Sequence, residues 1–460
     1  MEETNKPRSS TRLGFHYFND SLHYRESDLL CWLPELKACG ASWLTLITPH
    51  DRAIPEGFIR TLIMEGIQPL LHFKPFLPHL PDMDSLKLLF NVYSDWGVRY
   101  AVLYDRPNRR QSWPGNSWAQ NDLVERFLDL YLPVADLAIQ AGLAPVFPPL
   151  QPGGDYWDTA FLRAALAGIK RRGQERLVET LVLGAYAWVD GHDLGWGAGG
   201  PERWPKARPY ITPEGQQDQL GFYITDWYQA IAEAELGSPR PMVVLAAGYH
   251  PNLAGGSEDC GIDLAHHTEV HATIARLMAG QTVENPVSGG MLTPPSAYVL
   301  SCNFWLLAAD TGSPDSSLAW FRPQTNGAPV INLPIVTAMR QLQKNPGAYD
   351  FPNLNGAQTP SHRPIDHYLL LSEAVLDSWG QVPDDLWAYI RQYQPTTGFS
   401  SEEAALAARV SVLGDEDIFP DSLLESIRSA GAVVERLNGD GISIAPLTAT
   451  HNTENMRGEP

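Results

Sequence analysis

The stretch "YAVLYDRPNRR", residues 100–110, begins like a buried strand and ends in a charged turn. Its first residues are apolar, and it breaks at Asp105-Arg106-Pro107, where proline has no backbone N–H with which to continue a sheet. A helical pattern follows over 121–142, with an asparagine cap at Asn121 and a glycine at its end. This single strand–helix unit decides the fold if it recurs along the chain.

The unit recurs seven more times. Each further run is short and apolar on both faces, as expected for parallel strands that helices cover on the outside. Eight alternating units predict an α/β fold, a (β/α)8 TIM barrel, while the doubly wound alternative lacks a GxGxxG after its first strand. The seven other runs are "LGFHYF" from Leu13, "SWLTLI" from Ser42, "QPLLHF" from Gln68, "APVF" from Ala144, "LVLGAYAW" from Leu181, "MVVLAA" from Met242 and "CNFWLLAA" from Cys302.

Composition shifts divide the chain into domains. The segment 346–364 is rich in Pro, Gly and Asn, which is typical of a linker. We therefore expect the barrel to span 13–345 after a disordered N-terminus, 1–12. A small C-terminal α/β module should occupy 365–447, followed by a disordered polar tail, 448–460.

The chain of 460 residues is acidic, with a formal net charge of −20. This charge repels phosphate backbones and acidic lipid surfaces, so neither a nucleic acid nor a membrane is an expected partner. The first residues are polar and resemble no signal peptide, so we expect a cytoplasmic protein. The four cysteines are predicted to be reduced, since Cys31 and Cys39 lie roughly 12 Å apart along one helix, too far for a disulfide.

Polar and aromatic side chains gather where the predicted strands end, and barrel active sites lie at those carboxyl ends. Flat aromatic faces next to hydrogen-bonding groups suit sugar rings, so we predict that an oligosaccharide or other glycan binds there, without a cofactor. The predicted ligand-binding residues are His16, His50, His72, Asp105, Arg106, Asn108, Trp113, Trp118, Trp188, Asp190, Trp196, Trp204, Tyr249, His250 and Trp305.

Three stretches resemble a known enzyme clan. The triplet Asp105-Arg106-Pro107 stands where that clan has Asn-Glu-Pro, and "LAAG", 245–248, stands where it often has Thr-Glu-Ala-Gly. The segment "PPLQPGGDYWDTAFLRAAL" from Pro148 is similar to the one after the clan's fifth strand. Over 13–345 the chain thus resembles the clan A retaining glycoside hydrolases, which include β-xylosidases and α-L-iduronidases. The resemblance implies that Arg106 occupies the acid/base position and Ala246 the nucleophile position.

These two replacements remove the chemistry that the resemblance would otherwise imply. Retaining hydrolysis needs two carboxyl groups about 5–5.5 Å apart. Arginine is too weak an acid to protonate a glycosidic oxygen, and alanine offers no nucleophilic atom. We therefore predict a carbohydrate-binding barrel that has lost its retaining catalytic pair. Arg106 should project into the mouth and pair with an aspartate such as Asp155 or Asp190.

Two alternatives stay open. An inverting hydrolase needs two carboxyl groups about 6.5–9.5 Å apart, and the mouth offers four candidates. A scaffold that binds a protein segment is the other alternative. The candidate carboxylates are Asp105, Asp155, Asp190 and Asp310.

Two further sequence patterns carry weaker signals, one for a metal site and one for a cell-wall-binding repeat. His267 and His271 have an i, i+4 spacing that can bind zinc, but the glutamate is misplaced for HExxH, and we predict no metal. The segment 410–441 resembles one bacterial cell-wall-binding repeat. Only one copy is present, which favours a packing module.

Overall fold

The computed structural model describes residues 11–49, 52–119, 121–189, 191–249, 263–285, 288–324, 328–344, 365–372, 384–393, 395–414 and 416–437. The chain forms two compact units, Met1–Phe351 and Pro352–Pro460. Each is described by itself.

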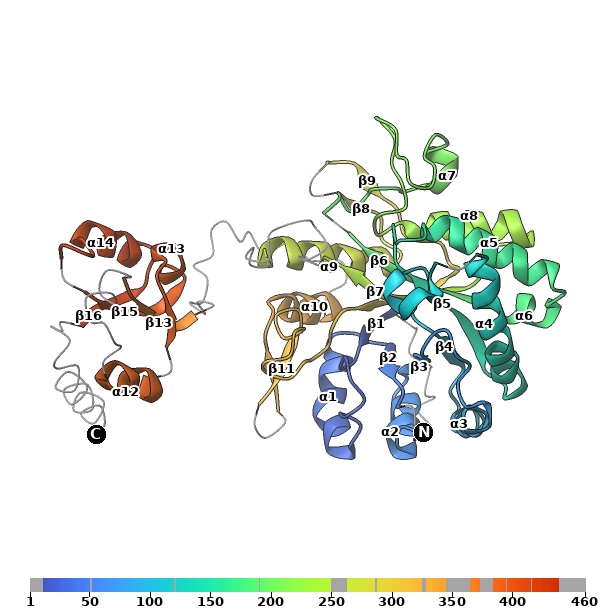
Figure 1. Cartoon of the computed structure of the whole chain (residues 1–460), viewed down its shortest axis with the longest axis horizontal. Helices are drawn as coiled ribbons and strands as arrows, with labels where there is room; N and C mark the ends of the chain where they lie inside the picture. The colour runs from blue at the N-terminus through green and yellow to red at the C-terminus, as the bar shows by residue number, and fades with distance from the viewer. Residues whose placement is uncertain are drawn as a thin grey trace, which may run out of the picture. The chain divides into compact units, whose positions relative to one another are not determined.

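Eight parallel strands of the first unit close into a barrel in the order β1-β10-β7-β6-β5-β4-β3-β2 (Figure 1). The predicted (β/α)8 fold is confirmed. The eighth strand begins at Val299, before its predicted run of 302–309, and ends at Phe304, within that run. The barrel strands are β1 (Leu13–His16), β2 (Trp43–Ile47), β3 (Gln68–Phe73), β4 (Tyr100–Leu103), β5 (Ala144–Leu150), β6 (Val182–Trp188), β7 (Met242–Gly248) and β10 (Val299–Phe304).

Helices surround this barrel. The expected asparagine cap of α4 is wrong, because that helix begins at Leu123 and the residue before it, Asp122, adopts a left-handed φ of 61° without a side-chain capping bond. The long barrel helices are α1 (Glu26–Ala38), α2 (Glu56–Met64), α3 (Met83–Asp95), α4 (Leu123–Gln140), α5 (Asp158–Arg171), α8 (Ile224–Leu236), α9 (Leu264–Met278) and α10 (Ile335–Lys344). Short elements between them are η1 (Arg110–Ser112), η2 (Gly115–Ser117), α6 (Glu175–Thr180), α7 (Gly200–Arg203) and the pairs β8 (Val283–Glu284) with β9 (Met291–Leu292) and β11 (Phe321–Pro323) with β12 (Pro329–Ile331).

Side chains alternate between two core layers along each strand. On β4, Val102 belongs to the apolar cluster inside the barrel, while Ala101 and Leu103 belong to the larger cluster between strands and helices. On β3, Leu70 points inward and Leu71 outward in the same way. This alternation determines which residues reach the mouth at each strand end.

The second unit is a small α/β module, as predicted. Its parallel sheet has the order β14-β13-β15-β16. The predicted linker, the tail and the N-terminal 1–10 lie outside the described residues, so the domain boundaries stay predictions. The module's elements are β13 (Ile365–Leu370), α12 (Asp384–Tyr393), β14 (Thr396–Gly398), α13 (Ser401–Ala404), β15 (Ala407–Leu413), α14 (Asp421–Ser429) and β16 (Val433–Leu437).

Two further features concern the cysteines and the helices of the described residues. Cys31, Cys39 and Cys302 are free thiols, and Cys260 lies outside the described residues. Among the helices described, none has the length and apolar character needed to cross a bilayer.

Candidate functional site

The mouth of the barrel is shaped by a break in side-chain alternation at the end of β4. Tyr104 should point inward after Val102, but its φ of 68° turns it outward. Its ring packs edge-on against Phe127 at 5.7 Å, and its hydroxyl donates to the carbonyl of Leu130 on α4. A non-glycine residue in this region costs on the order of 1 kcal/mol or more. The consequence is that Asp105, the next residue, points into the barrel.

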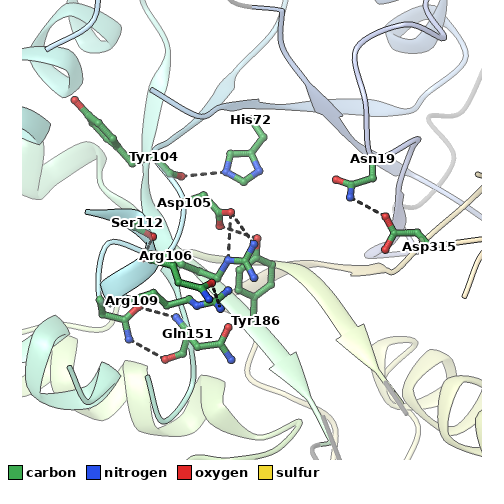
Figure 2. Close-up of polar contacts among 12 residues, drawn as sticks. Asn19, His72, Tyr104, Asp105, Arg106, Arg109, Ser112, Gln151, Tyr186 and Asp315 are labelled. Atoms are coloured by element: carbon green, nitrogen blue, oxygen red, sulfur yellow. Dashed lines mark hydrogen bonds and ion pairs between the residues drawn. The ribbon is translucent and has the colours of Figure 1, made fainter. Parts of the chain in front are cut away.

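Asp105 is held by two neighbours inside the mouth (Figure 2). Its Oδ1 accepts a 2.8 Å hydrogen bond from the Tyr186 hydroxyl on β6. Its Oδ2 accepts from Nε and Nη2 of Arg106 at 3.2 and 3.0 Å. The same guanidinium lies over the Tyr186 ring, 5.4 Å from its centroid. The three side chains therefore form one unit in which each is oriented by the other two.

The charges around Asp105 keep its carboxyl group ionised. Burial alone would raise its pKa, but the charge of Arg106, followed by the neighbouring His72 ring, Lys74 and the Tyr186 hydrogen bond, lowers the pKa to about 2; His72 adds a positive charge only when it is itself protonated at low pH. An acid this strong stays deprotonated at neutral pH and has no proton to give to a leaving group.

Two buried histidines and a lysine line the same part of the mouth. Burial, and then the charge of Lys74, lowers the pKa of His72 to about 3 and holds the pKa of His16 well below its usual range, so both imidazoles are neutral. The Nε2 of His72 bonds the Tyr104 carbonyl at 3.0 Å. Its Nδ1, and both ring nitrogens of His16, have no hydrogen-bond partner among the described residues. Burial also lowers the pKa of Lys74, which Asp105 counteracts.

Two tryptophans complete the set. Trp188 ends β6, and its ring meets that of Trp305 edge-on at 6.4 Å. Trp305 follows β10 and packs on the His16 ring at 4.5 Å. The buried indole N–H of Trp305 bonds to none of the described residues. We call these eight residues the mouth cluster: His16, His72, Lys74, Asp105, Arg106, Tyr186, Trp188 and Trp305.

Two predicted ligand-binding residues hold the loops together. Asn108 is fully buried: its amide donates to the carbonyls of Gln151 and Tyr156 at 2.8 and 2.9 Å, and its oxygen accepts from the Gln151 N–H at 2.8 Å. Trp113 is only 2% exposed, and its indole donates to the Pro107 carbonyl. Every polar atom of both side chains is used within the protein, which favours a role in clamping the loops, and ligand binding by these two residues stays a prediction.

Replacing Asn108 by alanine is expected to lower the free energy of unfolding by about 2–3 kcal/mol, because it removes three partly buried hydrogen bonds, and of the three backbone groups only the Gln151 carbonyl keeps a further bond among the described residues, from the Gly154 N–H. Urea unfolding measures this change. Gln111→Ala, in the same loop but at an exposed hydrogen bond to Arg109, is the matched control and should change stability by less than about 0.5 kcal/mol. Equal effects of the two variants would contradict the role of Asn108 as a clamp.

Four other predicted aromatic residues are partly exposed, and no contact with the mouth cluster is seen for them. Trp196 stacks on His192 at 4.2 Å and donates to Asp218, and Trp204 donates to the Ala198 carbonyl. Tyr249 meets the ring edge of His266 at 5.0 Å. Trp118 packs against the outer core layer.

One predicted partner of Arg106 does not lie beside it. Asp155 is exposed and accepts from the backbone N–H of Arg110 at 2.9 Å, so the prediction that it pairs with Arg106 is wrong. Asp310 is 59% exposed and lies 3.4 Å from His23. His50, Asp190 and His250 lie outside the described residues, and their predicted roles stay predictions.

Ala246 is fully buried in the cluster inside the barrel, on β7, and lies in register with Tyr186 of β6. The position assigned to a nucleophile by resemblance therefore presents a methyl group to the barrel interior.

Sequence reasoning missed two members of the mouth cluster. Lys74, just after the third predicted strand, and Tyr186, within the sixth, are both absent from the predicted ligand-binding residues. The alternation of side chains along a strand could have identified Tyr186. It lies two residues before Trp188 on the same predicted strand, so the two side chains should share one face of the sheet. Asp158 was missed too: it is buried with a pKa raised by burial to about 6, but it accepts from Gly153, Gln219 and Tyr228 and fixes the loop after β5.

The histidine pair considered for zinc lies in α9, where His267 and His271 are buried and stacked at 3.9 Å. The Nδ1 of His271 bonds the His267 carbonyl at 2.7 Å. Within the described part of the chain, no group of three or more His, Cys, Asp or Glu side chains is arranged to hold a metal ion.

No family model and no curated protein sequence matches the chain. Similar solved structures include a family 51 α-L-arabinofuranosidase from Bifidobacterium longum, at 12% identity and a TM-score of 0.42, covering 72% of this chain and 73% of that one. A GH128 endo-β-1,3-glucanase from Sorangium cellulosum has 15% identity and a TM-score of 0.38, covering 71% and 97%. A Saccharomyces cerevisiae Gas2 mutant, solved with laminaritetraose and laminaripentaose, has 10% identity and a TM-score of 0.38, covering 71% and 60%. Values this low assign neither a family nor an activity to the chain.

Proposed function

We propose that the barrel binds a carbohydrate at its mouth and does not carry out retaining hydrolysis. The observation that supports this most is the Asp105–Arg106–Tyr186 unit next to two tryptophans. It combines fixed hydrogen-bonding groups with aromatic surface at the end of the barrel where ligands bind.

The unit offers the polar contacts that a sugar needs. The Arg106 side chain remains 35% exposed, and Asp105 uses only part of its acceptor capacity. A carboxylate and a guanidinium side by side can bind neighbouring hydroxyls, one accepting and the other donating. Trp188 and Trp305 supply faces for the C–H side of a ring.

The same residues do not support a retaining mechanism. The acid must arrive protonated, and Asp105 is ionised while Arg106 is permanently charged. The nucleophile must be an oxygen at the opposite side of the sugar, and Ala246 provides a methyl group. At these positions no side chain can form the covalent glycosyl-enzyme intermediate of a retaining hydrolase, and none can assist its hydrolysis as acid or base.

Calorimetric titration with a panel of neutral and acidic oligosaccharides tests this proposal. We expect at least one to bind with a Kd of about 1 mM or tighter, and Trp305→Ala to weaken that binding about tenfold, as expected for the loss of an aromatic contact. Trp204→Ala is the matched control, since Trp204 lies outside the mouth cluster. It should change the Kd less than about twofold.

Three outcomes would count against the proposal. Absence of binding across the panel would remove the carbohydrate ligand, and equal effects of the two tryptophan variants would move the site away from the mouth cluster. Release of new reducing ends would show that catalysis persists. If the product then has inverted anomeric configuration by NMR, the aspartate-pair mechanism is favoured.

A further inference from the structure

A groove opens between the loop after β3 and the helix α3. It has a volume of about 460 Å³, within the range of about 300–1,000 Å³ typical of small-molecule sites. Most of the surface that lines it is apolar, and proline and phenylalanine rings contribute to this surface. We call it the β3–α3 groove; its walls include Phe73, Lys74, Phe76, Leu80, Asp82 and Leu86.

Apolar surface in the groove is left uncovered. The Phe76 side chain is 78% exposed and Leu80 is 48% exposed, whereas Phe73 and Leu86 are buried beneath them. An exposed apolar surface over a formed cavity is typical of a binding site, whereas scattered single residues are not. Flat proline and phenylalanine faces favour a flat, apolar occupant.

The charges at the two ends of the groove differ. Lys74 lines the groove and also belongs to the mouth cluster, where the Asp105 carboxylate favours its charge, although no hydrogen bond or salt bridge joins its ammonium to a described residue. Asp82 lies in the other part of the wall, but its carboxylate already caps α3, accepting from the N–H of Asp84 and from both the N–H and hydroxyl of Ser85. A partly buried, unpaired ammonium is costly, and an incoming anion would offset that cost. Lys74 and Arg106 bring two positive charges to the single Asp105 carboxylate, so this end of the groove keeps an excess of positive charge among the described residues of the mouth cluster.

We propose that the β3–α3 groove binds an aromatic acid, with its rings in the apolar part and its carboxylate or sulfonate on Lys74. The groove wall does not include Trp188 or Trp305, but it shares Lys74 with the mouth cluster; the proposal does not depend on the proposed function. The net charge of −20 disfavours anion binding elsewhere on the protein. Saturable binding of such an acid therefore requires a local cation.

A pair of fluorescent probes tests the two parts of the proposal separately. 8-Anilinonaphthalene-1-sulfonate carries the anion, and N-phenyl-1-naphthylamine has the same rings without it. We expect the sulfonate to bind the full-length chain at one saturable site. Lys74→Met should weaken the sulfonate about tenfold, the usual scale for one hydrogen bond to a charged group, and leave the neutral probe within about twofold.

The apolar part has its own variant and control. Phe76→Ser should weaken both probes about fivefold or more, and its exposure means that the variant should fold. Leu88→Ser is the matched control: Leu88 is 67% exposed on α3 and is not part of the groove wall, so neither probe should respond. 2-Naphthoate should displace the sulfonate, and 2-naphthamide should do so at least about tenfold less effectively.

The proposal is overturned if Lys74→Met binds the sulfonate as the parent does, or if Phe76→Ser leaves both probes unaffected. Sedimentation velocity distinguishes another occupant. If the parent self-associates and Phe76→Ser abolishes that association, a second copy of the chain covers the groove and the aromatic-acid site is wrong. Oligosaccharide titrations are a separate measurement from the probe titrations. If no sugar bound, the proposed function would fail, while the response of the two probes to Lys74→Met and Phe76→Ser would still decide the aromatic-acid site.

Discussion

Replacing Asp105 by asparagine is expected to lower the free energy of unfolding by about 3 kcal/mol at pH 7. The variant leaves the partly buried Arg106 guanidinium beside a neutral amide, and breaking one partner of such a pair costs about 3–5 kcal/mol when both are buried. The Arg106 side chain is 35% exposed and that of Asp105 15%, which places the expected value at the lower end. Guanidinium chloride unfolding measures the change.

The pH dependence of this loss has a definite sign. The folded pKa of Asp105, about 2, lies below its ordinary value of 3.8, so its contribution is present above pH 4 and lost as the pH falls toward 2. The difference between parent and Asp105→Asn should therefore shrink over that interval. Asp155→Asn is the control, since Asp155 is exposed with one backbone bond, and it should cost less than about 1 kcal/mol. A pH-independent difference would contradict the ion-pair account.

Introducing a glutamate at Ala246 is expected to destabilise the barrel by about 4 kcal/mol at pH 7, which is a large part of a domain's stability. Ala246 is fully buried beside the Tyr186 strand position, among apolar side chains such as Val243 and Leu245. An ionised carboxylate there has lost its water without gaining a cation. Thermal and urea unfolding of Ala246→Glu measure the effect.

Ala246→Gln separates charge from volume, because it adds a side chain of nearly the same size without the charge. The glutamate's folded pKa should be raised above its unfolded value of about 4.3. Its extra destabilisation relative to glutamine is then greatest at pH 7 and disappears as the pH falls below about 4. If the two variants were equally stable at pH 7, the position would have access to water or to a cation, and the description of Ala246 as an interior methyl would be wrong.

The sequence predicted the barrel because its strands are set by a repeated physical pattern. Short runs such as 68–73 and 242–248 are apolar on both faces, and the only stable environment for them is a parallel sheet covered by helices. The end of the helix over 121–142 was predicted at Gly142, which takes a left-handed conformation with a φ of 88°. The start of α4 was missed because its cap depends on local backbone geometry at Asp122, not on residue type.

The site was predicted only in part, because contacts between distant loops decide it. Nothing near Asn108 in the sequence shows that Gln151 and Tyr156 will use all of its hydrogen-bonding groups. The same holds for Trp113, whose loop folds it under Pro107. Residue types suited to a ligand are also suited to clamping loops, and only the folded partners distinguish the two.

The outward turn of Tyr104 has a consequence for redesign of this barrel. It displaces the alternation of inward and outward side chains by one residue at the end of β4. Asp105 therefore points into the barrel, and the side chain of Arg106 lies beside it in the mouth. An engineer who grafts a proton donor by matching sequence triplets would alter Arg106 and leave an existing carboxylate beside the new one. The better starting point is residue 105, already inward and oriented by Tyr186, with the guanidinium next to it removed so that a proton can be retained.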